Sequence, residues 1–135
     1  MPIQYRSDAL RQSLANLHRQ SSDVHGSAII TGDGLIIASY PPGWEGDIHD
    51  PTGGENVAAM AAVVVSTAER TMSRLALGNL ERVLIEGETN IVGVFPATHD
   101  SALTVLIAKD AKLGLALHAA RKTALDIAGI LNTNK

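Results

Sequence analysis

The sequence contains no cysteine and very few aromatic residues. The absence of cysteine excludes disulfide bonds and thiol chemistry and is compatible with a reducing compartment. Aromatic residues make up only 3% of the chain, whereas hydrophobic residues make up 45%. The core is therefore expected to be aliphatic and to depend on the close packing of leucine, isoleucine, valine and alanine.

The sequence also lacks an excess of positive charge and a long apolar run. Its 11 lysines and arginines against 14 acidic residues give a formal net charge of −3, and the scattered basic residues argue against nucleic-acid binding. The first residues lack the charged start and apolar stretch of a secretory signal, and no segment is long and apolar enough to cross a bilayer. These features predict a soluble, cytoplasmic protein that does not insert into membranes.

The length of 135 residues fits one domain, 1–135, and the hydrophobic periodicity predicts three helices and five strands in it. The helices are expected over 5–20, 55–76 and 113–131. The strands are expected at 27–31, 35–39, 80–87, 91–96 and 102–108. Short connections make neighbouring strands antiparallel. The expected fold class is α/β, as an α+β sandwich: a five-stranded antiparallel sheet in the order α-β-β-α-β-β-β-α, with helices on both faces.

Local signals mark the turns and helix ends. Gly32-Asp33-Gly34 suits the positive φ angles of a tight hairpin better than it suits a phosphate-binding loop, because no helix starts after it. Thr52 or Gly54 is expected near the N-cap of the central helix, with Glu55 in the first turn, where the helix dipole favours a carboxylate. Gly78 is expected to close that helix.

The central helix presents two different faces. One is a broad apolar stripe that is expected to pack on the domain's own sheet: Val57, Met60, Val64, Ala68, Met72 and Leu75, with Ala61 and Val65 at its edge. The opposite side holds small residues followed by polar and charged ones: Ala59, Ala62, Val63, Ser66, Glu69, Arg70, Ser73 and Arg74. Small residues let another backbone approach closely, so this side predicts a helix-to-helix contact in a homodimer. The alternative is that alanine, the best helix former, simply fills exposed positions.

The strand expected at 80–87 has the character of a sheet edge. Its alternation places Val83 and Ile85 on one face and Arg82, Leu84 and Glu86 on the other. Charges on both sides of Leu84 are typical of an edge strand, whose free backbone groups are a ready site for pairing with another chain.

Residues capable of chemistry are few and do not form a set. Asp47, His49 and Asp50 lie together in the loop over 40–54 and could ligate a metal in principle, but no second set of ligands is spaced to join them, and Asp50 before a proline is typical of a turn. The five histidines are dispersed, and no G-x-S-x-G motif is present. No cofactor or metal is therefore expected. Trp44 in the same loop is expected either to plug the loop from beneath or to be exposed as a contact with a partner.

Four segments in succession resemble the Roadblock/LC7 domain family of dynein light chains and prokaryotic regulators of small GTPases. They are the hairpin GSAIITGDGLIIAS, the helix start ENVAAMAA, the link LGNLERVLIEGE and the ending KLGLALHAARKTALDIAGIL. The resemblance covers nearly the whole chain. It implies a homodimer formed through the central helix and the strand after it, here Glu55 to Ala76 and Leu80 to Gly87.

The resemblance also implies the function. The family holds or regulates Ras-like small GTPases, so the chain is expected to be a homodimeric, non-enzymatic regulator or adaptor of such a GTPase. A GTPase-activating partner is one form that such a regulator could take. Arg70 and Arg74 could approach a nucleotide phosphate of that partner, or they could be solvated surface charges. The alternatives are a nucleotide-independent scaffold of the dynein-light-chain type and, less favoured, a small-molecule sensor. The expected dimer and partner surface comprises Ala59, Ala62, Val63, Ser66, Arg70, Ser73, Arg74, Arg82, Leu84 and Glu86.

Overall fold

The structure, a computed structural model, describes residues 2–46, 49–110 and 112–132. It consists of three α-helices, five strands and one short 3-10 turn. The helices are α1 (Pro2–Gln20), α2 (Gly54–Arg74) and α3 (Leu113–Leu131). The strands are β1 (Val24–Thr31), β2 (Ile36–Tyr40), β3 (Val83–Glu86), β4 (Asn90–Thr98) and β5 (Ser101–Ala108), and the 3-10 turn η1 covers Trp44–Gly46. The predicted order of elements is confirmed.

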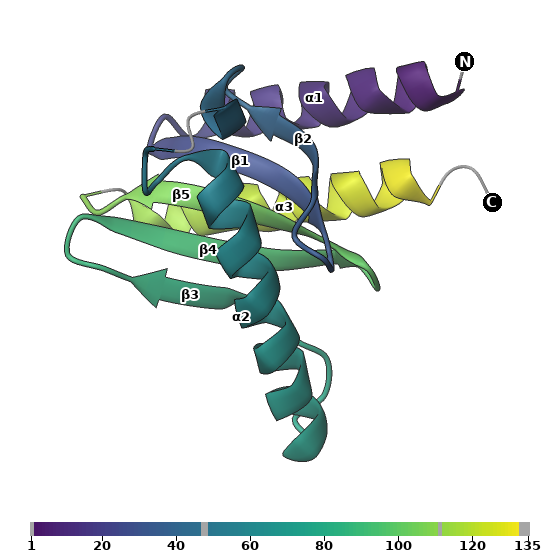
Figure 1. The fold of residues 1–135 in the computed structure, drawn as a ribbon, viewed down its shortest axis with the longest axis vertical. Coiled ribbons are helices and arrows are strands. Elements are labelled where there is room, and N and C mark those ends of the chain that lie inside the picture. Colours follow the sequence, from purple (N-terminus) through teal and green to yellow (C-terminus); the bar gives the residue numbers. More distant parts are fainter. Residues whose placement is uncertain (1, 47–48, 111, 133–135) are drawn as a thin grey trace.

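The five strands form one antiparallel sheet in the order β2-β1-β5-β4-β3. Figure 1 shows α1 and α3 on one face of this sheet and α2 on the other. The central strand β5 is covered on both faces, and every residue of 101–107 is accordingly buried. The strands at the two edges, β2 and β3, are the shortest of the five. The prediction that the strand over 80–87 is an edge strand is confirmed, although β3 is limited to its second half.

Each face of the sheet has its own aliphatic core. On one face, leucines at helical spacing in α1 and the apolar stripe of α3 pack on the sheet around Phe95 and Leu103. On the other face the α2 residues are mostly alanines, which pack on Ala28, Ile30 and Val94. Because small side chains separate α2 from the sheet, the helix lies close to it. Gly34, with a φ of 86°, brings the β1–β2 turn to 3.4 Å from the Ala59 Cα, measured from the position of a Cβ built on the glycine.

The C-terminal end of α2 differs from the prediction. The helix ends at Arg74, and Ala76, with a φ of 55°, takes the left-handed conformation that usually falls to glycine. The Leu77 N–H donates to the Met72 carbonyl at 3.0 Å and closes the last turn. Gly78 also has a positive φ but lies in the loop beyond, so the prediction that Gly78 closes the helix is wrong. At the other end the N-cap is Gly53, and Glu55 lies in the first turn as predicted.

Candidate protein interaction surface

The two halves of α2 have different surroundings. The first half contributes all the buried residues of the helix: Gly54, Val57, Ala58, Ala61, Ala62 and Val65. From Ser66 to Asn79 no residue is buried. Figure 1 shows the reason, because the helix crosses the sheet and then continues past β3 with no strand beneath it. We refer to residues 66–77 as the projecting segment.

The projecting segment carries apolar side chains that contact little within the subunit. Leu75 and Leu77 are 63% and 59% exposed, and Met72 is only half-buried. A helix that lies on solvent alone would present polar residues all round. Leucines at the end of an unsupported segment therefore make this segment a candidate interaction surface.

The edge strand β3 lies next to the point where α2 leaves the sheet. Val83 packs in the alanine-rich core beneath α2, and Ile85, on the same side of the strand, is 45% exposed. Ile85 and the 62% exposed Met60 line an apolar hollow of about 200 Å³ between α2 and the strands β3, β4 and β5. The hollow lies beside the first half of α2 and the loop before it, and the projecting segment continues from the other end of the helix past β3.

Most of the residues predicted for the partner surface of α2 are exposed. This group consists of Ala59, Val63, Ser66, Arg70, Ser73 and Arg74. Ala62 is an exception: it is only 6% exposed and packs on the sheet. The prediction for Ala62 is wrong because the buried arc of α2 is rotated toward Ala58 and Ala62, away from Met60, relative to the arc drawn from periodicity. Whether the exposed residues contact a partner stays a prediction.

The predicted residues Leu84 and Glu86 share one face of β3, the face opposite α2. Arg82, just before the strand, and Glu86 are exposed, and Glu86 pairs with Lys109 at 3.2 Å in a surface ion pair of small energetic value. Leu84 is half-buried, and its side chain lies over Gly93 near Phe95. Leu84 and Glu86 are therefore both on the wrong face of the sheet for a contact continuous with α2.

The apolar members of this surface were not among the predicted site residues. They are Met60, Leu75, Leu77 and Ile85. The sequence assigned Met60 and Leu75 to the stripe that packs on the domain's own sheet, because periodicity reveals an apolar stripe but not the width of the sheet beneath it. For Leu77, the only indication in the sequence was its position between the end of the predicted helix and the predicted edge strand.

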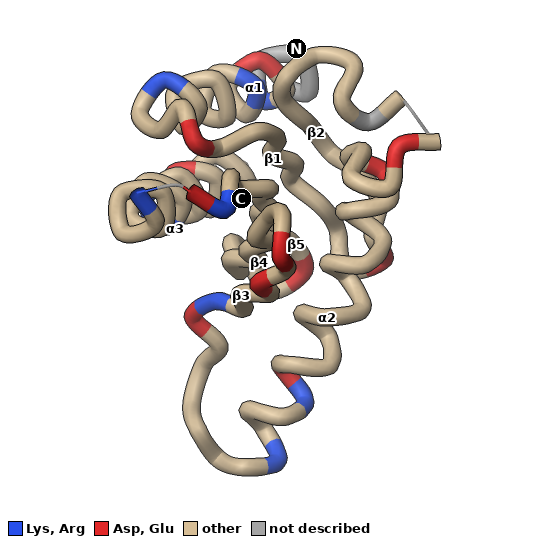
Figure 2. Tube along the Cα trace, turned by 90° about the vertical axis from the view of Figure 1, so that its left-hand side faces the viewer, with Lys and Arg blue, Asp and Glu red and all other residues tan. Residues whose placement is uncertain are grey.

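The charges of α2 are concentrated in its second half. Figure 2 shows the basic residues of this helix near the end that projects, and acidic residues near its start. Among the residues that the structure describes, neither Arg70 nor Arg74 makes an ion pair or a side-chain hydrogen bond. Both guanidinium groups are therefore available to an acidic partner.

The loop before α2 is folded onto the subunit. The Trp44 ring packs over Gly26, so closely that a Cβ at Gly26 would lie 2.4 Å from the ring, and its indole N–H donates to the Thr52 carbonyl at 3.1 Å. The first alternative for Trp44, a plug beneath the loop, is the one that the structure favours. Asp50 accepts hydrogen bonds from the Thr52 N–H and hydroxyl, which is the turn geometry expected for it.

No metal-ligand cluster is present among the described residues. Asp47, the first member of the possible trio in this loop, lies outside them. No helix of the described part is long and apolar enough to cross a membrane.

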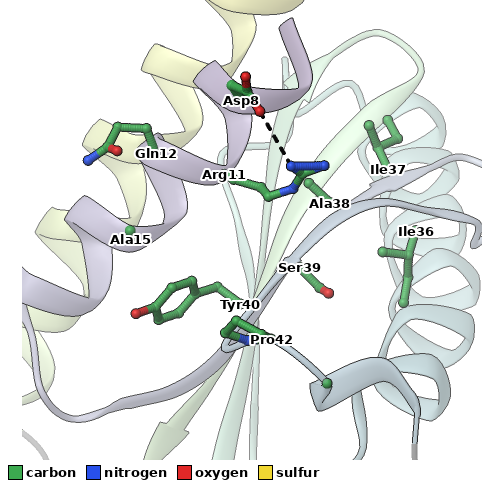
Figure 3. A pocket seen from close by; sticks show the side chains of 11 residues that line it. Asp8, Arg11, Gln12, Ala15, Ile36, Ile37, Ala38, Ser39, Tyr40 and Pro42 are labelled. Carbon is green, nitrogen blue, oxygen red and sulfur yellow. Dashed lines mark ion pairs between the residues drawn. The ribbon is translucent and has the colours of Figure 1, made fainter. Parts of the chain in front are cut away.

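A larger hollow than the one beside α2 lies elsewhere, between α1 and the edge strand β2 (Figure 3). It has a volume of about 790 Å³ and is lined by small and apolar residues of β2 with Gln12, Asp8 and Arg11 of α1. Asp8 and Arg11 pair with each other at 3.5 Å, so the hollow offers no unpaired charge to a ligand. Behind it, His18 donates to or accepts from the Ser27 hydroxyl at 2.9 Å, and burial, with a smaller contribution from His25, lowers the pKa of His18 to about 4. The His18 ring also packs against the Tyr40 ring, with centroids 4.6 Å apart, so its contacts connect α1 with β1 and β2.

The fold is an α+β sandwich, and α2 and β3 form its candidate interaction surface. Comparison with known proteins gives the family. Residues 11–107 match the family model for the Roadblock/LC7 domain, and the chain belongs to the Roadblock/LC7 family.

A relative and two solved structures illustrate the match. The uncharacterised protein MJ0714 of Methanocaldococcus jannaschii is 38% identical over 104 residues, which cover 77% of this chain and 79% of that protein. MglB of Myxococcus xanthus has a similar fold, with a TM-score of 0.80 at 13% identity over 94% of this chain and 90% of that one. A Roadblock/LC7 domain from Streptomyces avermitilis gives a TM-score of 0.76 at 18% identity, over 91% and 98%.

Proposed function

We propose that the chain is a homodimeric, non-enzymatic regulator or adaptor of a Ras-like small GTPase. The observation that carries the homodimer is the projecting segment, an apolar stripe of helix with no sheet beneath it, next to an unpaired edge strand. Two-fold symmetric interfaces use the same patch on both subunits, so they need a patch that is complementary to itself. A free edge, a hollow and an overhanging helix on one side of the subunit meet this requirement.

In the proposed dimer the two β3 edges pair and extend the sheet from one subunit into the other. The projecting segment of each subunit then lies over the sheet of its partner. Met72 and Leu75, which continue the stripe of α2, would contact the apolar side chains around Ile85 and Met60 in the partner. In this dimer both halves of the α2 stripe would pack on a sheet, the first half on the sheet of its own subunit and the second half on that of the other subunit.

The proposed GTPase partner rests on family membership and on charge. The Roadblock/LC7 fold is generally a regulatory or adaptor fold, and the described residues contain no catalytic constellation. Arg70 and Arg74 are exposed and unpaired on the side of α2 that faces away from the sheet. They would bind an acidic surface of a cytoplasmic GTPase, whose nucleotide belongs to that partner. The second candidate, a nucleotide-independent scaffold, uses the same dimer and differs only in whether binding depends on the nucleotide.

Light scattering tests the dimer. Leu75→Asp and Ile85→Asp should each convert a dimer into a folded monomer, because a charge in an apolar contact is costly when the contact excludes water. Leu115→Asp is the matched control, since Leu115 on α3 is also 63% exposed but lies outside the proposed interface. A wild-type monomer, or Leu75 and Ile85 variants that remain dimers, would refute the proposed interface.

Binding to a GTPase tests the function. The dimer is mixed with a Ras-like GTPase from the same source, loaded with GDP or with a GTP analogue. Complex formation with the GTP form only would support the regulator, and binding to both forms would support the scaffold. If hydrolysis by the GTPase is stimulated, Arg70→Ala and Arg74→Ala distinguish two roles: an inserted arginine is worth about 10³-fold or more in rate, whereas a docking arginine changes affinity and leaves the saturated rate unchanged.

A further inference from the structure

A second surface with exposed apolar and unpaired polar side chains lies on the opposite face of the sheet, between α1 and α3. A groove of about 630 Å³ runs between the two helices, lined by Ala9, Gln12, Ser13, Asn16, Leu125, Asp126, Gly129 and Ile130. It is separated by the whole thickness of the sheet from α2 (Figures 1 and 2). It therefore stays open in the proposed dimer.

Four residues of this groove are poorly explained by the subunit alone. Leu125 is 66% exposed. Gly129 lies inside α3, where glycine is less favourable than alanine, yet a Cβ built on it meets no atom within 4 Å. The Ser13 side chain is only 7% exposed and its hydroxyl has no hydrogen-bond partner. Asp126 makes no ion pair or hydrogen bond among the described residues.

We infer that the α1–α3 groove binds an amphipathic helix of another protein, which carries apolar residues on one face and a lysine or arginine beside them. A groove between two packed helices offers parallel ridges, and a third helix fits such ridges with its own side chains. Leu125 supplies an apolar contact, and the open space above Gly129 has room for an incoming side chain. Rotation of the Ser13 side chain turns its hydroxyl toward a polar group of the ligand.

Charge selects the class of partner. Among the described residues that line the groove, Asp126 is the only charged one, so it favours a basic residue on the ligand and opposes an anionic membrane or a nucleic acid. An extended peptide is less suitable, because the groove is walled by helices and offers no strand edge for backbone pairing. Ion pairs in a partly desolvated groove contribute mainly to specificity, which makes the sign of the charge the property to test.

The test uses a displayed library of helical peptides in which one face is randomised. Selection on the wild-type dimer should enrich helices with leucine or isoleucine at helical spacing and a basic residue next to them. Binding of an enriched peptide, followed by fluorescence anisotropy, should weaken roughly tenfold with Asp126→Lys and recover when the basic residue of the peptide is changed to Glu. Asp33→Lys, the same charge reversal in the exposed β1–β2 turn away from the groove lining, is the matched control and should leave the affinity within about twofold.

Two further variants separate blocking from unfolding. Gly129→Arg fills the groove and should abolish binding, whereas Gly129→Ala should keep the fold at least as stable in a thermal melt, because alanine is the better helix former. No enrichment over selection on the Gly129→Arg protein would overturn the inference. Enriched helices that ignore both Asp126→Lys and Gly129→Arg would also overturn it, since they bind elsewhere. Neither result depends on the GTPase or on the α2–β3 dimer.

Discussion

The two halves of α2 form one continuous helix but face different environments. In the first half, three alanines and two valines are buried on the sheet, and Met60 is the largest of the exposed side chains. In the second half nothing is buried, although the apolar stripe continues through Ala68 and Met72 to Leu75. One helix thus combines core residues of the subunit with an exposed apolar segment, which we propose as the interface. The boundary between the two is the edge of the sheet, which lies at Val65.

The largest expected effect is on the free energy of unfolding, and it distinguishes the buried side of the first half of α2 from its exposed side. Ala58→Asp places a carboxylate at a site with 0% exposure, at a cost of roughly 2–7 kcal/mol, and should prevent stable folding. The neighbouring Ala59→Asp, at an exposed position, should change the free energy of unfolding by about 0.5 kcal/mol or less. Chemical denaturation followed by circular dichroism measures both. Equal destabilisation by the two variants would contradict the rotation of α2 on the sheet.

A second prediction concerns the anchor at the start of the first half. Trp44→Ala removes the ring from Gly26 and its hydrogen bond to Thr52, and should lower the free energy of unfolding by about 2 kcal/mol, less than for a fully buried ring. Gly26→Ala should displace the ring, because a Cβ there would meet it at 2.4 Å. The chain has one tryptophan, so its fluorescence should shift to the red in Gly26→Ala. Gly32→Ala, where a Cβ has no neighbour within 4 Å, should leave the spectrum unchanged.

The sequence predicted the framework of the fold correctly because the framework depends on local patterns. Three helical periods, five apolar runs and the glycines of the hairpin were sufficient for the order of elements, and the charges around Leu84 were sufficient for the edge strand. The placement of Gly78 failed because the helix closes on Ala76, a residue without the usual preference for a positive φ. Local preference was overruled there by the Leu77 to Met72 hydrogen bond.

The candidate surface was predicted less well, because the orientation of α2 on the sheet could not be derived from the sequence. A helical wheel orders residues by angle but does not fix the angle at which the helix rests on its sheet. Ala62 therefore fell on the wrong side, and Met60 was placed in the core. Periodicity also gives no information on where the sheet ends, so the exposed Leu75 was predicted to be a core residue. Avoiding both errors requires the positions of β3 and β4, which only the tertiary structure supplies.

A third prediction uses pH to compare the two faces of the sheet. The pKa of His18, on the side of α1 that faces the sheet, is lowered to about 4 by burial and then by His25, so the unfolded chain takes up a proton more readily than the folded one. Stability should be constant above pH 6.5 and fall as the pH decreases from 6.5 toward 4. The effect is moderate because the ring is only half-buried. His18→Gln should flatten this part of the profile of thermal midpoint against pH, whereas His99→Gln, in the exposed β4–β5 turn, should not. A fall that persists unchanged in His18→Gln would assign it to other groups.

The smallest expected effect concerns the end of the projecting segment. Ala76 has a φ of 55°, which costs a residue with a Cβ roughly 1 kcal/mol relative to glycine. Ala76→Gly should therefore stabilise the protein by about that amount or less, since glycine also gains freedom in the unfolded chain. The same substitution at Ala68, inside the helix, should destabilise by about 1 kcal/mol. Opposite signs in chemical denaturation would show that the segment is a true helix closed at Ala76. A destabilising Ala76→Gly would mean that this turn is held by contacts outside the subunit, and repeating the measurement on the Leu75→Asp monomer would show whether the dimer supplies them.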